Sequence, residues 1–163
     1  MTIKADFTEE EWARLARAPL VAGMAISLAD PGGPIEAIKE SSAAITTVLE
    51  AAQGGGHGEF VQALAQDVAE KARHRQNPMA GFRPKGADAR EQILDELRAV
   101  NDLLREKTTP EEAEQFREWL KTAAQRAAAA AKEGGFLGFH TERVSEGEQR
   151  MLDKLDEVFG AGA

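Results

Sequence analysis

Three acidic residues surround the turn that runs from Asp30 to Pro34, and carboxylate oxygens are the ligands that hard divalent cations prefer. Asp30 begins this Pro- and Gly-rich turn, and Glu36 and Glu40 follow it one helical turn apart. The spacing differs from the alternating ligands of an EF-hand loop. Acidic residues near a helix start are also explained by the helix dipole. The turn is therefore a candidate cation site, with helix stabilisation as the alternative.

The same turn carries a short family resemblance. The segment Ala25-Ile26-Ser27-Leu28-Ala29-Asp30-Pro31-Gly32-Gly33, with Glu36 after it, resembles the A-x-A-D-G…E turn of tellurite-resistance TerB-like helical domains. Those domains are small, acidic and all-α, and the resemblance implies that the acidic residues bind a divalent cation. This sequence departs from the pattern, because Pro31 separates Asp30 from Gly32 and no further Asp follows in the next helix. No function is transferred from the family.

The histidines form no recognised metal or catalytic motif. No two of them are four residues apart, so the H-E-x-x-H pattern of a zinc helix is absent. We add His140 to Asp30 and Glu36 as a third candidate metal ligand, with solvated loop histidines as the alternative. No nucleophile lies in a recognisable catalytic turn, and we therefore assign no catalytic residue.

A basic segment between Glu70 and Arg90 stands out from a chain whose net charge is −8. It also contains Phe82, and a basic segment with an aromatic residue suits a phosphate, an acidic peptide or a single nucleic acid strand. The alternative is a basic loop that pairs with acidic helices of its own fold or of a second copy. The candidate anion-binding residues are Arg73, Arg75, Arg83 and Lys85.

The segment from Gly134 to Val144 places the apolar residues Phe136, Leu137 and Phe139 among three glycines. Its Gly-Gly-x-x-Gly pattern is not a phosphate-binding loop, because neither a preceding strand nor a following Lys-Ser/Thr is present. Two interpretations remain. The apolar side chains pack into the core, or they form an exposed patch that binds a protein partner or a second copy.

The elements that must position these residues are predicted to be about six α-helices in a single all-α domain, with two helix–turn–helix halves as one arrangement. Alanine, Glu, Leu, Lys, Arg and Gln dominate the composition and favour helices. Three S/T-x-x-E capping boxes, at Thr8, Thr109 and Ser145, mark helix starts. The predicted helices span 9–29, 35–52, 59–75, 87–107, 110–133 and 146–159, with loops at 53–58 and 76–86 and a frayed end at 160–163.

Three features of these helices carry specific expectations. Pro19 lies inside the first helix and predicts a kink or a division into two short helices. In the second helix, the apolar spacing predicts that Ile45, Val48 and Leu49 face the core. In the fifth, the alanine tract from Ala127 to Ala131 predicts close approach of a neighbouring helix.

The overall composition excludes several classes of function. The net charge of −8 argues against broad binding to nucleic acid or anionic membranes, and the absence of cysteine excludes thiol chemistry. No apolar run is long enough to span a membrane, and the first residues lack a signal-peptide core, so we expect a cytoplasmic protein. The leading interpretation is a non-catalytic interaction module without a resident cofactor. The alternative is a divalent-cation or small-anion binding domain.

Overall fold

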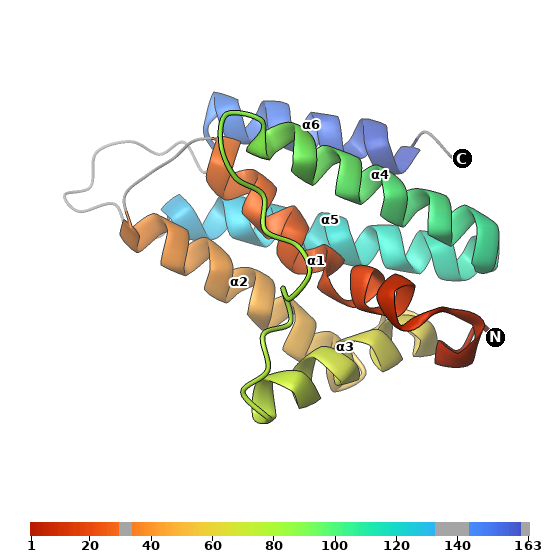
Figure 1. Ribbon diagram of the computed structural model, residues 1–163. Helices are drawn as coiled ribbons and strands as arrows, with labels where there is room; N and C mark the ends of the chain where they lie inside the picture. The colour runs from red at the N-terminus through yellow and green to blue at the C-terminus, as the bar shows by residue number, and fades with distance from the viewer. Residues whose placement is uncertain (30–33, 133–143, 161–163) are drawn as a thin grey trace.

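The computed structural model describes residues 1–29, 34–132 and 144–160, with the backbone alone at 34–38 and 131–132. Six α-helices pack together, and no strand occurs in the described part of the chain, which confirms the all-α prediction (Figure 1). A short 3-10 helix, η1 (Lys4–Asp6), precedes them. The α-helices are α1 (Glu9–Ala29), α2 (Pro34–Ala52), α3 (Gly58–Arg73), α4 (Ala89–Lys107), α5 (Pro110–Lys132) and α6 (Glu146–Gly160).

Three helices begin where the capping boxes predict. In each box the Glu carboxylate accepts a hydrogen bond from the backbone N–H of the cap residue, at 2.8–3.0 Å. The cap hydroxyl accepts one from the Glu N–H, at 3.2 Å in all three boxes. These reciprocal bonds satisfy backbone donors that a helix start otherwise leaves unpaired. The pairs are Thr8 with Glu11, Thr109 with Glu112, and Ser145 with Glu148.

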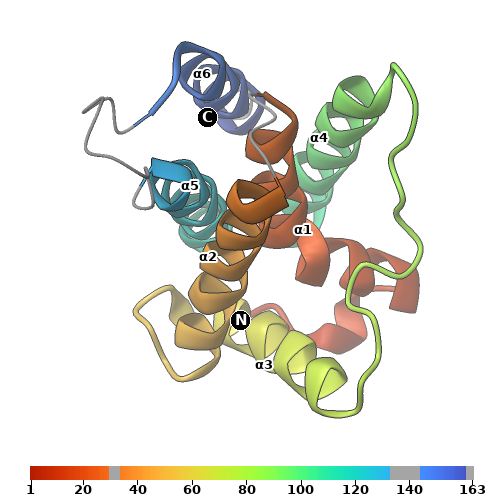
Figure 2. The same ribbon diagram turned by 90° about the vertical axis from the view of Figure 1, so that its left-hand side faces the viewer.

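Helix α1 lies at the centre of the bundle and contacts all five of the other α-helices (Figure 2). It runs without interruption through Pro19, so the division into two short helices is wrong and the kink, the other expectation at this residue, stays a prediction. Leu15, Ala18 and Pro19 are buried. Packing around this turn compensates for the backbone hydrogen bond that proline removes. Helix α2 packs against both α1 and α5. These contacts do not test the arrangement in two helix–turn–helix halves, which stays a prediction.

The alanine-rich face of α5 packs closely against α2, as the sequence predicts. Ala123, Ala124, Ala127 and Ala128 are all completely or almost completely buried. Helices α2 and α5 share the most extensive contact between any two described elements. Small side chains on this face let the two backbones approach, and the interface forms one side of the core.

The inward face of α2 differs from the prediction. Val48 is buried, but Ile45 is 48% exposed and Leu49 is 42% exposed. Small residues such as Ala44, together with Thr47, turn toward α1 and α5 instead. The helix is rotated in this way because the alanine face of α5 accepts small partners, and the two large aliphatic side chains are left at the edge of the core.

Helix α3 ends two residues earlier than predicted. Arg75 adopts a left-handed conformation with a φ of 55°, and the N–H of Gln76 donates to the carbonyl of Lys71 at 2.8 Å. This is the hydrogen bond of a Schellman motif, which ends a helix and usually places glycine where Arg75 stands. The sequence has no glycine there, which explains why the end was predicted too late. Residues 74–88, which we call the strap, then cross over α1 to the start of α4 (Figure 1).

The N-terminal segment is fixed to the start of α5 by Thr2. Its backbone N–H and its hydroxyl donate to the two carboxylate oxygens of Glu112, at 2.7 and 2.5 Å. Burial acts to raise the pKa of this carboxyl. The hydrogen bonds from Thr2 and Thr109 outweigh burial and lower the pKa from its ordinary 4.5 to about 2.

Acidification is therefore expected to destabilise the fold between pH 4.5 and pH 2. A carboxyl whose pKa is lowered by folding stabilises the protein fully above its unfolded pKa, and this stabilisation is lost as the pH falls through its folded pKa. Glu112→Gln should lower the free energy of unfolding at neutral pH by about 2 kcal/mol and flatten the acid limb of the stability curve. Urea titrations across this range measure both effects. Glu111→Gln, at an exposed position in the same helical turn, is the control. An acid limb unchanged in Glu112→Gln would contradict the assignment.

Candidate functional site

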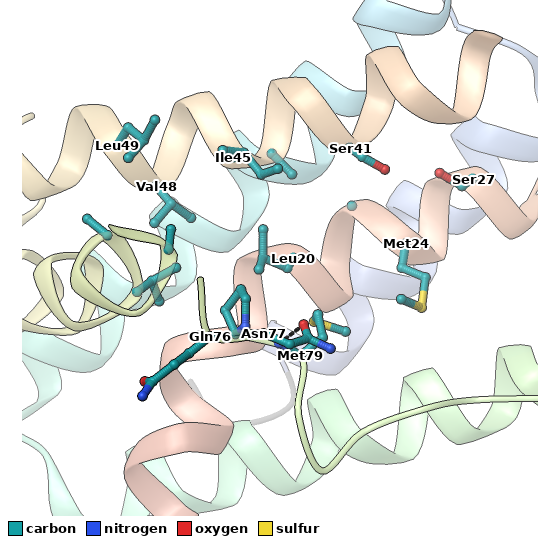
Figure 3. Close-up of a pocket in the computed structure, with 16 residues that line it drawn as sticks. Leu20, Met24, Ser27, Ser41, Ile45, Val48, Leu49, Gln76, Asn77 and Met79 are labelled. Carbon is teal, nitrogen blue, oxygen red and sulfur yellow. Dashed lines mark hydrogen bonds between the residues drawn. The ribbon is translucent and has the colours of Figure 1, made fainter. Parts of the chain in front are cut away.

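An open apolar pocket of about 510 Å³ lies between α1, α2, the end of α3 and the strap (Figure 3). We call it the α1–α2–α3 pocket. Leu20 and Met24 form its α1 wall, and Ile45 and Leu49 stand on its α2 side. The two exposed aliphatic residues of α2 thus border a cavity. The pocket is also lined by Gly23, Ser27, Ser41, Ala44, Ala69, Ala72, Gln76, Asn77 and Met79.

The pocket exists because small residues face one another across three helices. A Cβ added to Gly23 would lie 2.9 Å from the Cβ of Ala44, so α1 and α2 are in close contact at this level. On α3 the lining includes Ala69 and Ala72, which are too short to reach across. Close contact at one level and short side chains at the next leave an unfilled volume that opens to solvent.

Polar groups lie at both ends of the pocket. At one end, the hydroxyl of Ser27 donates to the carboxylate of Glu40, which is almost completely buried. At the other end, Gln76 and Asn77 line the mouth where α3 meets the strap. The side-chain oxygen of Asn77 accepts a hydrogen bond from the N–H of Met79 at 2.9 Å, which fixes the turn there (Figure 3). A bound molecule would therefore meet apolar walls and polar ends.

The strap is held in place by a buried ion pair. The guanidinium of Arg17 donates to the carboxylate of Glu96 from Nε at 3.2 Å and from Nη2 at 2.7 Å. Its Nη1 donates to the carbonyl of Ala80 at 3.2 Å, and it lies 5.8 Å from the ring centre of Phe82. Arg17 is 4% exposed and Glu96 is 8% exposed. This pair fixes the strap, and with it one wall of the pocket.

Sequence reasoning missed both the pocket and this ion pair. The pocket depends on the relative placement of three helices, for which the sequence carries no local signal. Arg17 did carry one, because it stands in an otherwise apolar stretch of α1 between Leu15 and Leu20. A charged residue in such a stretch is rarely buried unless it is paired.

The predicted anion-binding residues all lie at the end of α3 or in the strap, and all four are exposed. Among the described residues, none of Arg73, Arg75, Arg83 and Lys85 forms an ion pair. The predicted pairing with acidic helices of the same fold is therefore not seen for these four described residues, although Lys71 of the same basic segment pairs with Asp67 at 3.0 Å. Phe82 is partly buried and has the Arg17 guanidinium over its ring, so it is no free stacking surface.

The other predicted sites fall wholly or partly outside the described residues. Asp30 and His140 lie outside them, and Glu36 belongs to the part of α2 whose side chains are not described. Within the described ranges, no three His, Asp or Glu side chains gather closely enough to hold a metal ion. The apolar segment with Phe136, Leu137 and Phe139 also lies outside. The cation site and the partner-binding segment stay predictions.

Comparisons with known proteins do not assign the chain to a family. No family model, curated protein or solved structure matches it. The resemblance to TerB-like domains therefore stays a prediction. In the described helices, no segment is long and apolar enough to cross a membrane.

Proposed function

We propose that the chain is a non-catalytic binding module that holds a small apolar ligand in the α1–α2–α3 pocket. The observation that carries the proposal is the exposure of Ile45 and Leu49 beside an open apolar cavity of about 510 Å³. Large aliphatic side chains at the edge of a cavity gain free energy when a ligand removes them from water. The volume falls within the range typical of small-molecule sites.

The character of the lining supports binding rather than chemistry. None of the described residues that line the pocket is titratable, and its polar groups are two serines and two side-chain amides. Met24 and Met79 face the cavity (Figure 3). Methionine is unbranched and adapts to irregular shapes, which suits a site that accepts a flexible apolar molecule.

A pocket-filling substitution tests the proposal. Ala69 lines the pocket from α3 and is partly exposed, so a larger side chain there can enter open space rather than the packed core. We expect wild-type protein to bind the neutral apolar dye Nile red saturably, and Ala69→Phe to bind it about tenfold or more weakly. Fluorescence titration measures the affinities, and thermal melting followed by circular dichroism confirms that each variant is folded.

Ala63→Phe is the matched control. It places the same side chain on the same helix at an exposed position that does not line the pocket. Wild-type affinity in this control, with loss in Ala69→Phe, supports the proposed site. Equal affinities in all three proteins would place the dye elsewhere, and absence of saturable binding would overturn the proposed function.

A further inference from the structure

The apolar pocket and the basic residues meet at the end of α3. Ala72 and Gln76 line the pocket, while Arg73 and Arg75 lie between them in the chain and are exposed. On a helix, residues 69, 72 and 73 share one side, since neighbours three and four apart lie on the same face. Arg73 therefore borders the lining formed by Ala69 and Ala72. Apolar and cationic surfaces are contiguous at this mouth.

The cationic side chains at the end of α3 differ in whether they form an ion pair with a described residue. Lys71, two residues before Arg73, is paired with Asp67 at 3.0 Å. Arg73 and Arg75 form no ion pair with any described residue, although the whole chain carries a net charge of −8. Free cationic side chains beside an otherwise acidic surface complement an anion of small size rather than a long polyanion, which the remaining surface would repel.

Neutral donors add to the two guanidinium groups. Gln76 and Asn77 both line the mouth. The side-chain oxygen of Asn77 is engaged by the N–H of Met79, so its amide N–H groups are the part that remains to donate. Guanidinium and amide donors together suit a carboxylate or phosphate group.

We infer that the ligand is a single-chain anionic amphiphile, whose alkyl chain occupies the α1–α2–α3 pocket and whose carboxylate or phosphate lies at Arg73 and Arg75. This inference rests on the proposed function and specifies its ligand class. The apolar walls account for the alkyl chain, and the cationic mouth accounts for the head group. The head group remains at the solvent edge, where an anion keeps part of its hydration.

Head-group comparison at constant chain length tests the inference. Displacement of Nile red is measured for decanoate, decyl phosphate, 1-decanol and decyltrimethylammonium. The ionic compounds are kept below their micelle-forming concentrations, and 1-decanol is kept below its solubility limit. We expect the two anions to bind about tenfold more tightly than the alcohol, and the cation to bind more weakly than the alcohol. The preference for anions should shrink as salt is added, because the mouth is exposed and screened.

Charge-removing variants locate the head group. In Arg73→Gln/Arg75→Gln the anions should bind no better than 1-decanol, while the affinity for 1-decanol is unchanged. Arg83→Gln/Lys85→Gln removes the same charge from a more distant part of the strap and should keep the preference. A preference lost equally in both variants would indicate a long-range charge effect and overturn the assignment to Arg73 and Arg75.

Chain length reports the position of the alkyl chain. From octanoate to decanoate to dodecanoate, each added CH₂ should tighten binding about fourfold until the pocket is full. Anion binding without this dependence would mean surface ion pairing alone and would overturn the inference. If 1-decanol binds but decanoate binds no better, the ligand class is wrong and the proposed function stands. If none of the compounds displaces the dye, the proposed function itself fails.

Discussion

The Glu96→Gln variant is expected to unfold with a free energy about 3–5 kcal/mol below that of the wild type. Arg17 is almost completely buried in α1, and the Glu96 carboxylate accepts hydrogen bonds from two of its nitrogens. A neutral amide cannot compensate the charge of a buried guanidinium. In this variant the Arg17 guanidinium therefore remains in the core as an unpaired charge. Urea unfolding followed by tryptophan fluorescence measures the loss.

Partner variants separate the ion pair from its surroundings. Arg14 also contacts the Glu96 carboxylate at 3.2 Å, so Arg17→Met leaves a cation near that acid. The double variant Arg17→Met/Glu96→Gln should be less destabilised than the sum of the two single changes, because the Arg17 guanidinium that Glu96→Gln leaves buried without its acid is then absent. Glu91→Gln, at an exposed site on the same helix, should cost less than about 0.5 kcal/mol.

Glu96→Gln should also loosen the strap. Arg17 connects Glu96 to the carbonyl of Ala80, and within the strap the N–H of Phe82 donates to the carbonyl of Met79. When Arg17 loses its acid, the rate of native-state hydrogen exchange should rise above its wild-type value. This increase should be larger at the amides of Ala80 and Phe82 than at the core amides of α5. A stability loss in Glu96→Gln no larger than that in Glu91→Gln would show that the pair does not hold the strap.

The parts of the fold that follow from local chemistry could be predicted from the sequence. The boxes at Thr8, Thr109 and Ser145 each need only four consecutive residues, and all three helices begin there. The alanine face of α5 was also predictable, because five small residues in succession leave room for a neighbouring backbone. In both cases the determining residues lie within one or two turns of each other.

The parts that depend on distant neighbours could not be predicted. The exposure of Ile45 and Leu49 follows from how α2 rotates against the alanine face of α5, far away in the chain. The left-handed Arg75 ends α3 without the glycine that usually marks such an end. The pocket itself requires Gly23 to meet Ala44 while α3 contributes the short side chains of Ala69 and Ala72. Periodicity in one helix predicts an apolar face but not its partner.

The Asn101→Leu variant is the second large effect, with an expected loss of about 3 kcal/mol in the free energy of unfolding. Asn101 is buried in α4 and joins two other helices. Its side-chain N–H₂ donates to the carbonyl of Val158 in α6 at 3.2 Å, and its oxygen accepts from Nε of the buried Arg117 in α5 at 3.0 Å. Leucine is similar in size, so the loss reports hydrogen bonding rather than a cavity.

Two groups are left unsatisfied by this change. The Val158 carbonyl belongs to the last turn of α6, where helix carbonyls have no partner within the helix. Among the described residues, Arg117 would keep only its contact with the exposed Glu114, at 3.7 Å. A buried charged donor without a partner costs more than a neutral one, so most of the expected loss arises at Arg117.

Asn101→Asp distinguishes the two contributions. The carboxylate still accepts from Arg117 and adds an opposite charge, but it cannot donate to Val158 and it places negative charge near the carbonyl end of α6. We expect Asn101→Asp to be destabilised by less than Asn101→Leu if Arg117 dominates, and by as much or more if Val158 does. Asp102→Leu introduces the same side chain at the exposed next position and should stay within about 0.5 kcal/mol of wild type. Equal stability of Asn101→Leu and Asp102→Leu would mean that the buried network makes no net contribution, and that apolar packing alone holds α6 on α4 and α5.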